Sequence, residues 1–141
     1  IHVLIGVTGI MASYMTLMWL FKREIPMRLL KGGSLVAFIA YITSWVTGGY
    51  YYVVYYGGNV KPVIKEGPNP WIHLIVMEVK EHIFLFLPIL AFVILLVVWL
   101  KGDILQENRK LRNALALVAL ITFIIALSMA LGGVVISGAA R

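Results

Sequence analysis

Residues 71–100 read WIHLIVMEVKEHIFLFLPILAFVILLVVWL. This stretch exceeds the roughly 20 apolar residues that an α-helix needs to cross a bilayer. It nevertheless carries four ionisable side chains within one and a half turns, Glu78, Lys80, Glu81 and His82. Because ionisable groups are costly to place in lipid, a transmembrane helix that keeps them is a candidate for a functional site. This stretch therefore indicates both the class of fold and the place to look for function.

The rest of the chain is also too apolar for a water-soluble domain. Hydrophobic residues make up 62% of 141 positions, and the mean hydropathy is +0.97. A soluble domain of this size with that composition would expose large apolar patches. Four segments are long enough to span a membrane: residues 3–21, 34–56, 71–100 and 113–139. We therefore expect an all-α fold, an integral membrane four-helix bundle formed by a single domain.

The charges predict how the bundle is oriented. The net charge of +6 comes mainly from the loops after the first and third spans, which hold Lys22, Arg23, Arg28, Lys31, Lys101, Arg109, Lys110 and Arg112. Positive loops stay in the cytoplasm, so we expect both termini and the segment 57–70 on the outer side. This distribution favours the lipid bilayer over nucleic acid as the partner of the cations. A prokaryotic inner membrane is the expected location.

Proline and glycine suggest where helices end, bend or touch. Segment 57–70 holds three prolines and three glycines, so we expect a rigid loop there. Pro88 should kink the third span near Phe84, whose carbonyl loses its hydrogen-bond donor. The fourth span ends in small residues that allow close helix contact, either within the bundle or with another subunit. These residues are Ser128, Gly132, Gly133 and Ser137.

A projection at about 100° per residue gives the third span two faces. An apolar sector contains Ile72, Ile75, Val76, Val79, Ile83 and Phe86, and the polar side chains occupy the remaining arc. We therefore expect Glu78 and His82 to face the bundle interior or a partner, whereas Val79 and Ile83 face lipid.

Counting along the helices places two histidines at the same depth. His2 lies 19 residues before Phe21 and His82 lies 18 residues before Leu100, so both stand roughly 27 Å above the inner boundary. His73 would stand about 13 Å higher. Below His2, the small residues Gly6, Gly9 and Ser13 share one helix face. Two level imidazoles on different helices beside a small-residue face suit bis-histidine ligation of haem b.

In its four spans and in His2 and His82, the chain resembles the small four-helix b-type cytochromes of respiratory membranes. The resemblance implies electron transfer, quinol-linked or across the membrane, as a subunit of a larger complex of membrane proteins. His82 and His2 would then bind the haem iron, with His73 in reserve. Gly6, Gly9 and Ser13 would receive the porphyrin edge, and Glu78 would orient His82. The absence of cysteine excludes covalent c-type attachment.

Other interpretations of the same residues stay open. Glu78, Glu81 and His82, with His2 or His73, could bind iron, manganese, zinc or copper. Glu78 or Glu81 could instead accept protons at a quinol or quinone site. Finally, Lys80 could neutralise Glu81 while Glu78 pairs with His82, which would leave a structural seam of an accessory subunit without a cofactor. With such short loops, we expect a subunit of a redox complex more than an independent enzyme.

Overall fold

A computed structural model describes residues 2–140, and four of its helical stretches are long and apolar enough to cross a membrane. These stretches are His2–Leu20, Met27–Glu66, Ile72–Leu100 and Arg109–Ala139. Helix accounts for 88% of the structure, and residues 2–140 form no strand. The expected all-α class with four candidate spans is therefore confirmed, whereas the orientation of the termini stays a prediction.

Residues 2–140 form nine helical elements. In chain order these are α1 (His2–Leu20), α2 (Met27–Tyr51), η1 (Tyr52–Val60), α3 (Lys61–Glu66), η2 (Ile72–Met77), α4 (Glu78–Phe84), α5 (Phe86–Leu100), α6 (Gly102–Leu105) and α7 (Arg109–Ala139). Eight of them build the four stretches, and α6 lies in the connection between the third and the fourth. The elements η1 and η2 are π-helices, in which backbone hydrogen bonds join residues that are five positions apart.

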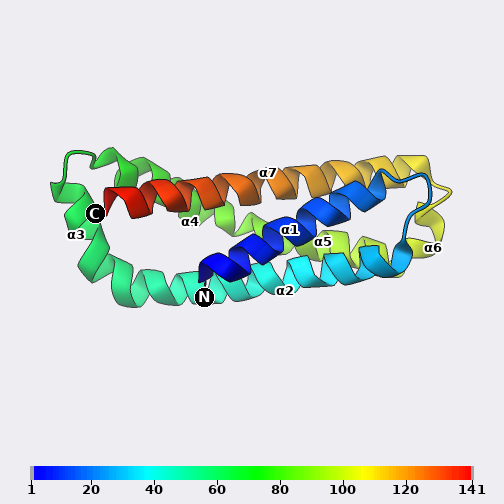
Figure 1. The fold of residues 1–141 in the computed structure, drawn as a ribbon, viewed down its shortest axis with the longest axis horizontal. Helices are drawn as coiled ribbons and strands as arrows, with labels where there is room; N and C mark the ends of the chain where they lie inside the picture. The colour runs from blue at the N-terminus through cyan, green and yellow to red at the C-terminus, as the bar shows by residue number, and fades with distance from the viewer. Residues whose placement is uncertain (1, 141) are drawn as a thin grey trace.

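The long helices form a bundle in which neighbours in sequence are mostly neighbours in space. Helix α1 packs on α2 and α7, α2 packs on α5, and α5 packs on α7, so α1 and α5 lie diagonally opposite (Figure 1). One end, which we call the basic end, holds the connections 21–26 and 101–108. The other, which we call the tyrosine-rich end, holds η1, α3, η2 and the end of α7 (Figure 1).

Three clusters of buried apolar side chains follow one another along the bundle. At the basic end the cluster centres on Leu20, Leu30 and Val98. In the middle it includes Tyr41 and Leu87, and at the tyrosine-rich end it includes Tyr56, Ile64, Ile72, Met77 and Ile136. Most other large apolar side chains point outward. This inside-out distribution is what a lipid-facing surface requires.

The expectation of a rigid loop over residues 57–70 is wrong for most of the segment. The chain stays helical to Glu66, and only residues 67–70 leave the helix. Pro62 lies in the first turn of α3, directly after η1, and the chain continues through it as a helix. The glycines Gly57 and Gly58 lie within η1.

Two expectations about packing along the third and fourth spans are confirmed. The third span is interrupted at Leu85, between α4 and α5, one residue from the position expected for the effect of Pro88. On α7, Gly132 and Gly133 face the third span. Methyl groups placed on them would lie 3.5 Å from Cγ1 of Val76 and 3.4 Å from Nζ of Lys80. The small residues therefore serve close contact within this bundle.

At the basic end, one side chain joins the two connections. The Gln106 amide accepts a hydrogen bond from the backbone N–H of Ile25 at 2.9 Å and donates one to the carbonyl of Arg23 at 2.8 Å. These paired bonds hold segment 21–26 against segment 101–108, which are far apart in sequence.

Candidate functional site

The polar side chains of the third span meet those of the second at the tyrosine-rich end. His73 is only 2% exposed, and its Nδ1 lies 3.0 Å from the hydroxyl of Tyr56. Its Nε2 faces Oε1 of Glu78 at 4.0 Å, and the Glu78 side chain is 47% exposed. A buried imidazole thus lies between a buried phenol and a carboxylate that reaches the surface. We call Tyr56, His73, Glu78, Tyr52 and Glu81 the His73 cluster.

The two π-helices position this cluster. Tyr56 lies in η1, where its ring stacks on that of Tyr52 with centroids 5.3 Å apart. His73 lies in the first turn of η2, and its backbone N–H bonds to the carbonyl of Pro70 at 3.1 Å. The short segment 67–70 therefore folds the chain back so that η2 meets η1.

A second carboxylate lies beside the first. Glu81, one turn along from Glu78, sits next to the hydroxyl of Tyr52. Its Oε1 is buried and has no hydrogen-bond partner among residues 2–140. A buried carboxyl oxygen without a donor is costly, so this atom of Glu81 calls for an explanation.

His82 was expected to face the bundle interior or a partner, and it does not face the interior. It is exposed, and its Nδ1 lies 2.7 Å from the carbonyl of Glu78 in its own helix. The physical reason is η2, because a π-helix turns less per residue than the α-helix assumed in the projection. Within η2, the side chains that turn inward are Ile72, His73 and Met77. Val79 faces outward as expected, while Ile83 is half-buried.

His2 is anchored to the second span. Its Nδ1 lies 3.0 Å from the carbonyl of Ser44 and 3.3 Å from its hydroxyl. Its ring covers Gly48, where a methyl group would come within 2.7 Å of the imidazole. The His2 ring therefore makes its hydrogen bond and its packing contact with α2.

Side chains of α2 also cover the small-residue face of the first span. A methyl group on Gly9 would lie 2.7 Å from the Tyr41 ring, and Ser13 hydrogen-bonds the Tyr41 hydroxyl at 2.8 Å. Gly6 lies opposite Ser44. Close packing on α2 therefore occupies the face that was expected to receive the porphyrin edge.

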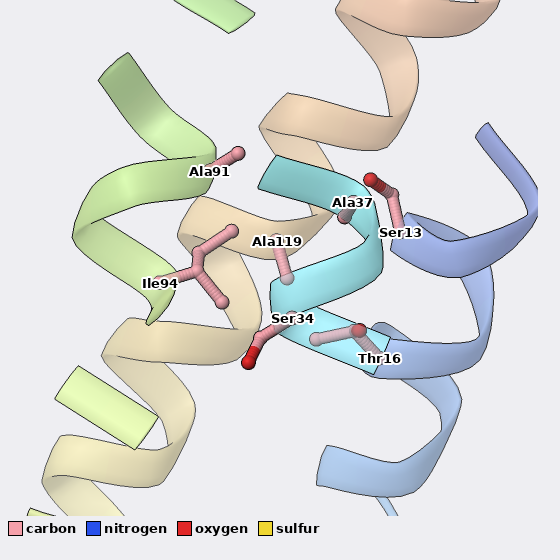
Figure 2. Close-up of a pocket in the computed structure, with 7 residues that line it drawn as sticks. All are labelled: Ser13, Thr16, Ser34, Ala37, Ala91, Ile94 and Ala119. Atoms are coloured by element: carbon pink, nitrogen blue, oxygen red, sulfur yellow. The ribbon is translucent and has the colours of Figure 1, made fainter. Parts of the chain in front are cut away.

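These placements do not fit a bis-histidine haem inside the bundle. His2 and His82 come from diagonal helices, one turned to α2 and the other outward. A cavity between the four spans has a volume of about 10 Å³, far smaller than a porphyrin (Figure 2). Nor do residues 2–140 bring three histidine or carboxylate side chains into an arrangement that could hold a metal ion.

Lys80 also departs from the pairing proposed for it. No ion pair joins it to Glu81 in the described part of the chain. Its ammonium instead lies against Gly133 of α7 and near the ring of His2.

Sequence reasoning missed the two tyrosines of the site. Tyr52 and Tyr56 were not among the candidate residues, although Tyr56 is 1% exposed. Their spacing of four residues, equal to that of Tyr51 and Tyr55, was the available signal for a stacked pair.

No family model, characterised protein or solved structure matches this chain.

Proposed function

We propose that this chain is a small membrane subunit whose His73 cluster transfers protons near the outer membrane surface, as part of quinol-linked electron transfer in a larger complex. One observation carries the proposal. Both ring nitrogens of a buried imidazole face titratable side chains, Tyr56 on one side and Glu78 on the other.

An imidazole in this setting can accept a proton at one nitrogen and release one from the other. The chain Tyr56–His73–Glu78 runs from a buried hydroxyl to a carboxylate that is half-exposed. It therefore offers a route from the interior of the bundle to its surface. Glu81, with a buried oxygen free to accept, supplies a place for a second proton.

Quinol oxidation requires such acceptors. A quinol that becomes a quinone gives up two protons and two electrons, and the Glu81 carboxylate and the His73 imidazole would each take one proton. The electrons would pass to a metal or haem centre on a partner subunit. Support for a subunit role comes from the short connections at the basic end, which leave little room for a further domain.

A haem remains a second candidate, at a different place. His82 is exposed, and a bond from its Nδ1–H to the Glu78 carbonyl would leave Nε2 free to bind iron. A haem bound there would lie between this chain and a partner. An absorption spectrum of the purified complex tests this, because replacing His82 with Ala would remove the haem bands.

Quinone binding tests the main proposal. Trp71 is exposed two residues before His73, so its fluorescence should be quenched by a short-chain ubiquinone bound at the cluster. In lipid nanodiscs we expect saturable quenching, weakened at least tenfold by His73→Gln and unchanged by His82→Gln. Equal binding by all three proteins would overturn the proposal.

Infrared spectroscopy tests separately whether Glu81 takes up a proton. The reduced-minus-oxidised difference spectrum of quinone-loaded nanodiscs should contain a carboxyl band that Glu81→Gln removes. The matched control is Glu66→Gln, an exposed carboxylate at the same end of the bundle. A band that survives in Glu81→Gln, or is lost in Glu66→Gln, would exclude Glu81 as the proton acceptor.

A further inference from the structure

A lysine and a tryptophan meet at the basic end, where the start of α2 lies beside the end of α5 (Figure 1). The ammonium of Lys31 lies over the Trp99 ring, 5.7 Å from its centre. An indole attracts a cation at this distance through the negative charge of its face. Trp99 is 50% exposed, so the pair lies at the surface of the bundle, far from the His73 cluster.

The first residue of α6 makes room for this contact. A methyl group placed on Gly102 would lie 3.1 Å from Sδ of Met27 and 3.5 Å from Cε of Lys31. Met27 and Lys31, one turn apart on α2, therefore pack across Gly102. Because the stem of Lys31 is held between Gly102 and the indole, the position of its charge is fixed.

The charge of this pair is not neutralised by the protein. Two exposed cations flank it, Arg28 one turn earlier on α2 and Lys101 directly before Gly102. Within residues 2–140, none of the three cations forms an ion pair with a carboxylate. Asp103, an exposed carboxylate of α6, is close in sequence but leaves an excess of positive charge. The surface is therefore suited to an anion.

From this pair toward the middle of the bundle, the outer surface between α2 and α5 is apolar. Phe38 of α2 contacts Phe92 of α5, with ring centroids 5.4 Å apart. Each phenylalanine lies seven residues from the lysine or tryptophan on its own helix, so both contacts lie on the same side of the two helices. Between them lie the exposed side chains Leu35 and Leu96. We call these four residues the α2–α5 seam, which extends over roughly 10 Å.

We propose that this surface binds one anionic phospholipid, with its phosphate at Lys31 between Arg28 and Lys101 and an acyl chain along the α2–α5 seam. A phosphate diester carries one negative charge, and its oxygens accept hydrogen bonds from ammonium and guanidinium groups. Free phosphate has the same chemistry but would leave the apolar seam uncovered. The combination of fixed cation and adjoining apolar surface therefore favours a lipid.

Native mass spectrometry of the detergent-solubilised protein tests this site. With phosphatidylglycerol added, the protein should retain one lipid, and it should retain less phosphatidylcholine of the same acyl chains, because that headgroup has no net charge. Lys31→Gln should weaken retention of phosphatidylglycerol about fivefold, the effect of one basic residue beside an anionic headgroup. Trp99→Leu should weaken it as well, although this variant keeps every charge, because the ammonium loses the ring that holds it.

Matched controls separate this site from general attraction by a basic protein. Lys22→Gln removes the same charge from an exposed lysine at the same end, and Trp71→Leu removes an exposed tryptophan at the other end. Both should retain phosphatidylglycerol as the unmodified protein does. Equal losses in Lys31→Gln and Lys22→Gln would overturn the proposal, as would unchanged retention in Lys31→Gln or Trp99→Leu. Displacement of the lipid when ammonium phosphate replaces ammonium acetate at equal ionic strength would assign the site to free phosphate instead.

Discussion

Gly9 and Gly6 lie on the face of α1 that packs against α2, yet only Gly9 lacks room for a methyl group. At Gly9 a Cβ atom would come within 2.7 Å of the Tyr41 ring and 3.3 Å of the Ala40 methyl group. At Gly6 the nearest atom, Oγ of Ser44, would be 3.7 Å away. Replacing each glycine with alanine therefore distinguishes the effect of packing from the effect of helix propensity.

We expect Gly9→Ala to destabilise the bundle and Gly6→Ala to stabilise it slightly. Overpacking a close contact costs about 1–3 kcal/mol, whereas alanine in place of a helical glycine gains at most about 1 kcal/mol. Gly9→Ala should therefore lose about 1 kcal/mol in free energy of unfolding, measured by titration with a denaturing detergent. An unchanged midpoint for Gly9→Ala would show that α1 moves away from Tyr41 without cost.

At the residue scale, the sequence analysis selected side chains that the structure brings together, but it did not predict which way all of them point. His73, Glu78 and Glu81 were all candidates, and all belong to the His73 cluster. The sequence could not show that His73 is buried and His82 exposed, because that difference depends on rotation about the helix axis. A few residues of π-helix change that rotation without leaving a clear sign in the sequence.

At the scale of elements, the limits of the helices follow the sequence where polar residues cap them. Helix α7 begins at Arg109 because the side chain of Asn108 accepts a hydrogen bond from the N–H of Leu111 at 3.0 Å. The predicted span began four residues later, at Asn113, because the hydropathy criterion ignores basic residues in a first turn. Hydropathy locates the part of a helix suited to lipid, whereas capping determines where the helix starts.

Replacing Asn108 tests whether its side chain caps α7. Asn108→Ala should lower the free energy of unfolding by about 1 kcal/mol, because the N–H of Leu111 loses its acceptor. Hydrogen exchange should speed up at Leu111 first, since the loss is local. Asn113→Ala is the control, an exposed position inside the helix where alanine is the better helix former. Equal protection of Leu111 in Asn108→Ala and the unmodified protein would contradict the assigned cap.

At the scale of the whole molecule, composition was sufficient for the class of fold but not for the ends of the bundle. Four apolar stretches separated by charged connections predict four helices, and the structure has them. The tyrosine-rich end was harder to predict, because Gly57, Gly58 and Pro62 suggested a loop where the chain is helical. Pairing of Tyr56 with His73 depends on how η1 and η2 fold back on each other. Local sequence patterns do not contain that information.

The charge asymmetry predicts which end faces the cytoplasm. The connections at the basic end carry most of the lysine and arginine, so the positive-inside rule places that end in the cytoplasm and Asn59 outside. Because the chain has no cysteine, single cysteines can be introduced without a background. Asn59→Cys and Glu107→Cys are suitable positions, since both residues are exposed and lie at opposite ends of the bundle. In intact cells a membrane-impermeant maleimide should label Asn59→Cys, whereas Glu107→Cys should react only after permeabilisation. The reverse pattern would place the His73 cluster on the cytoplasmic side, and its protons would then leave in the opposite direction.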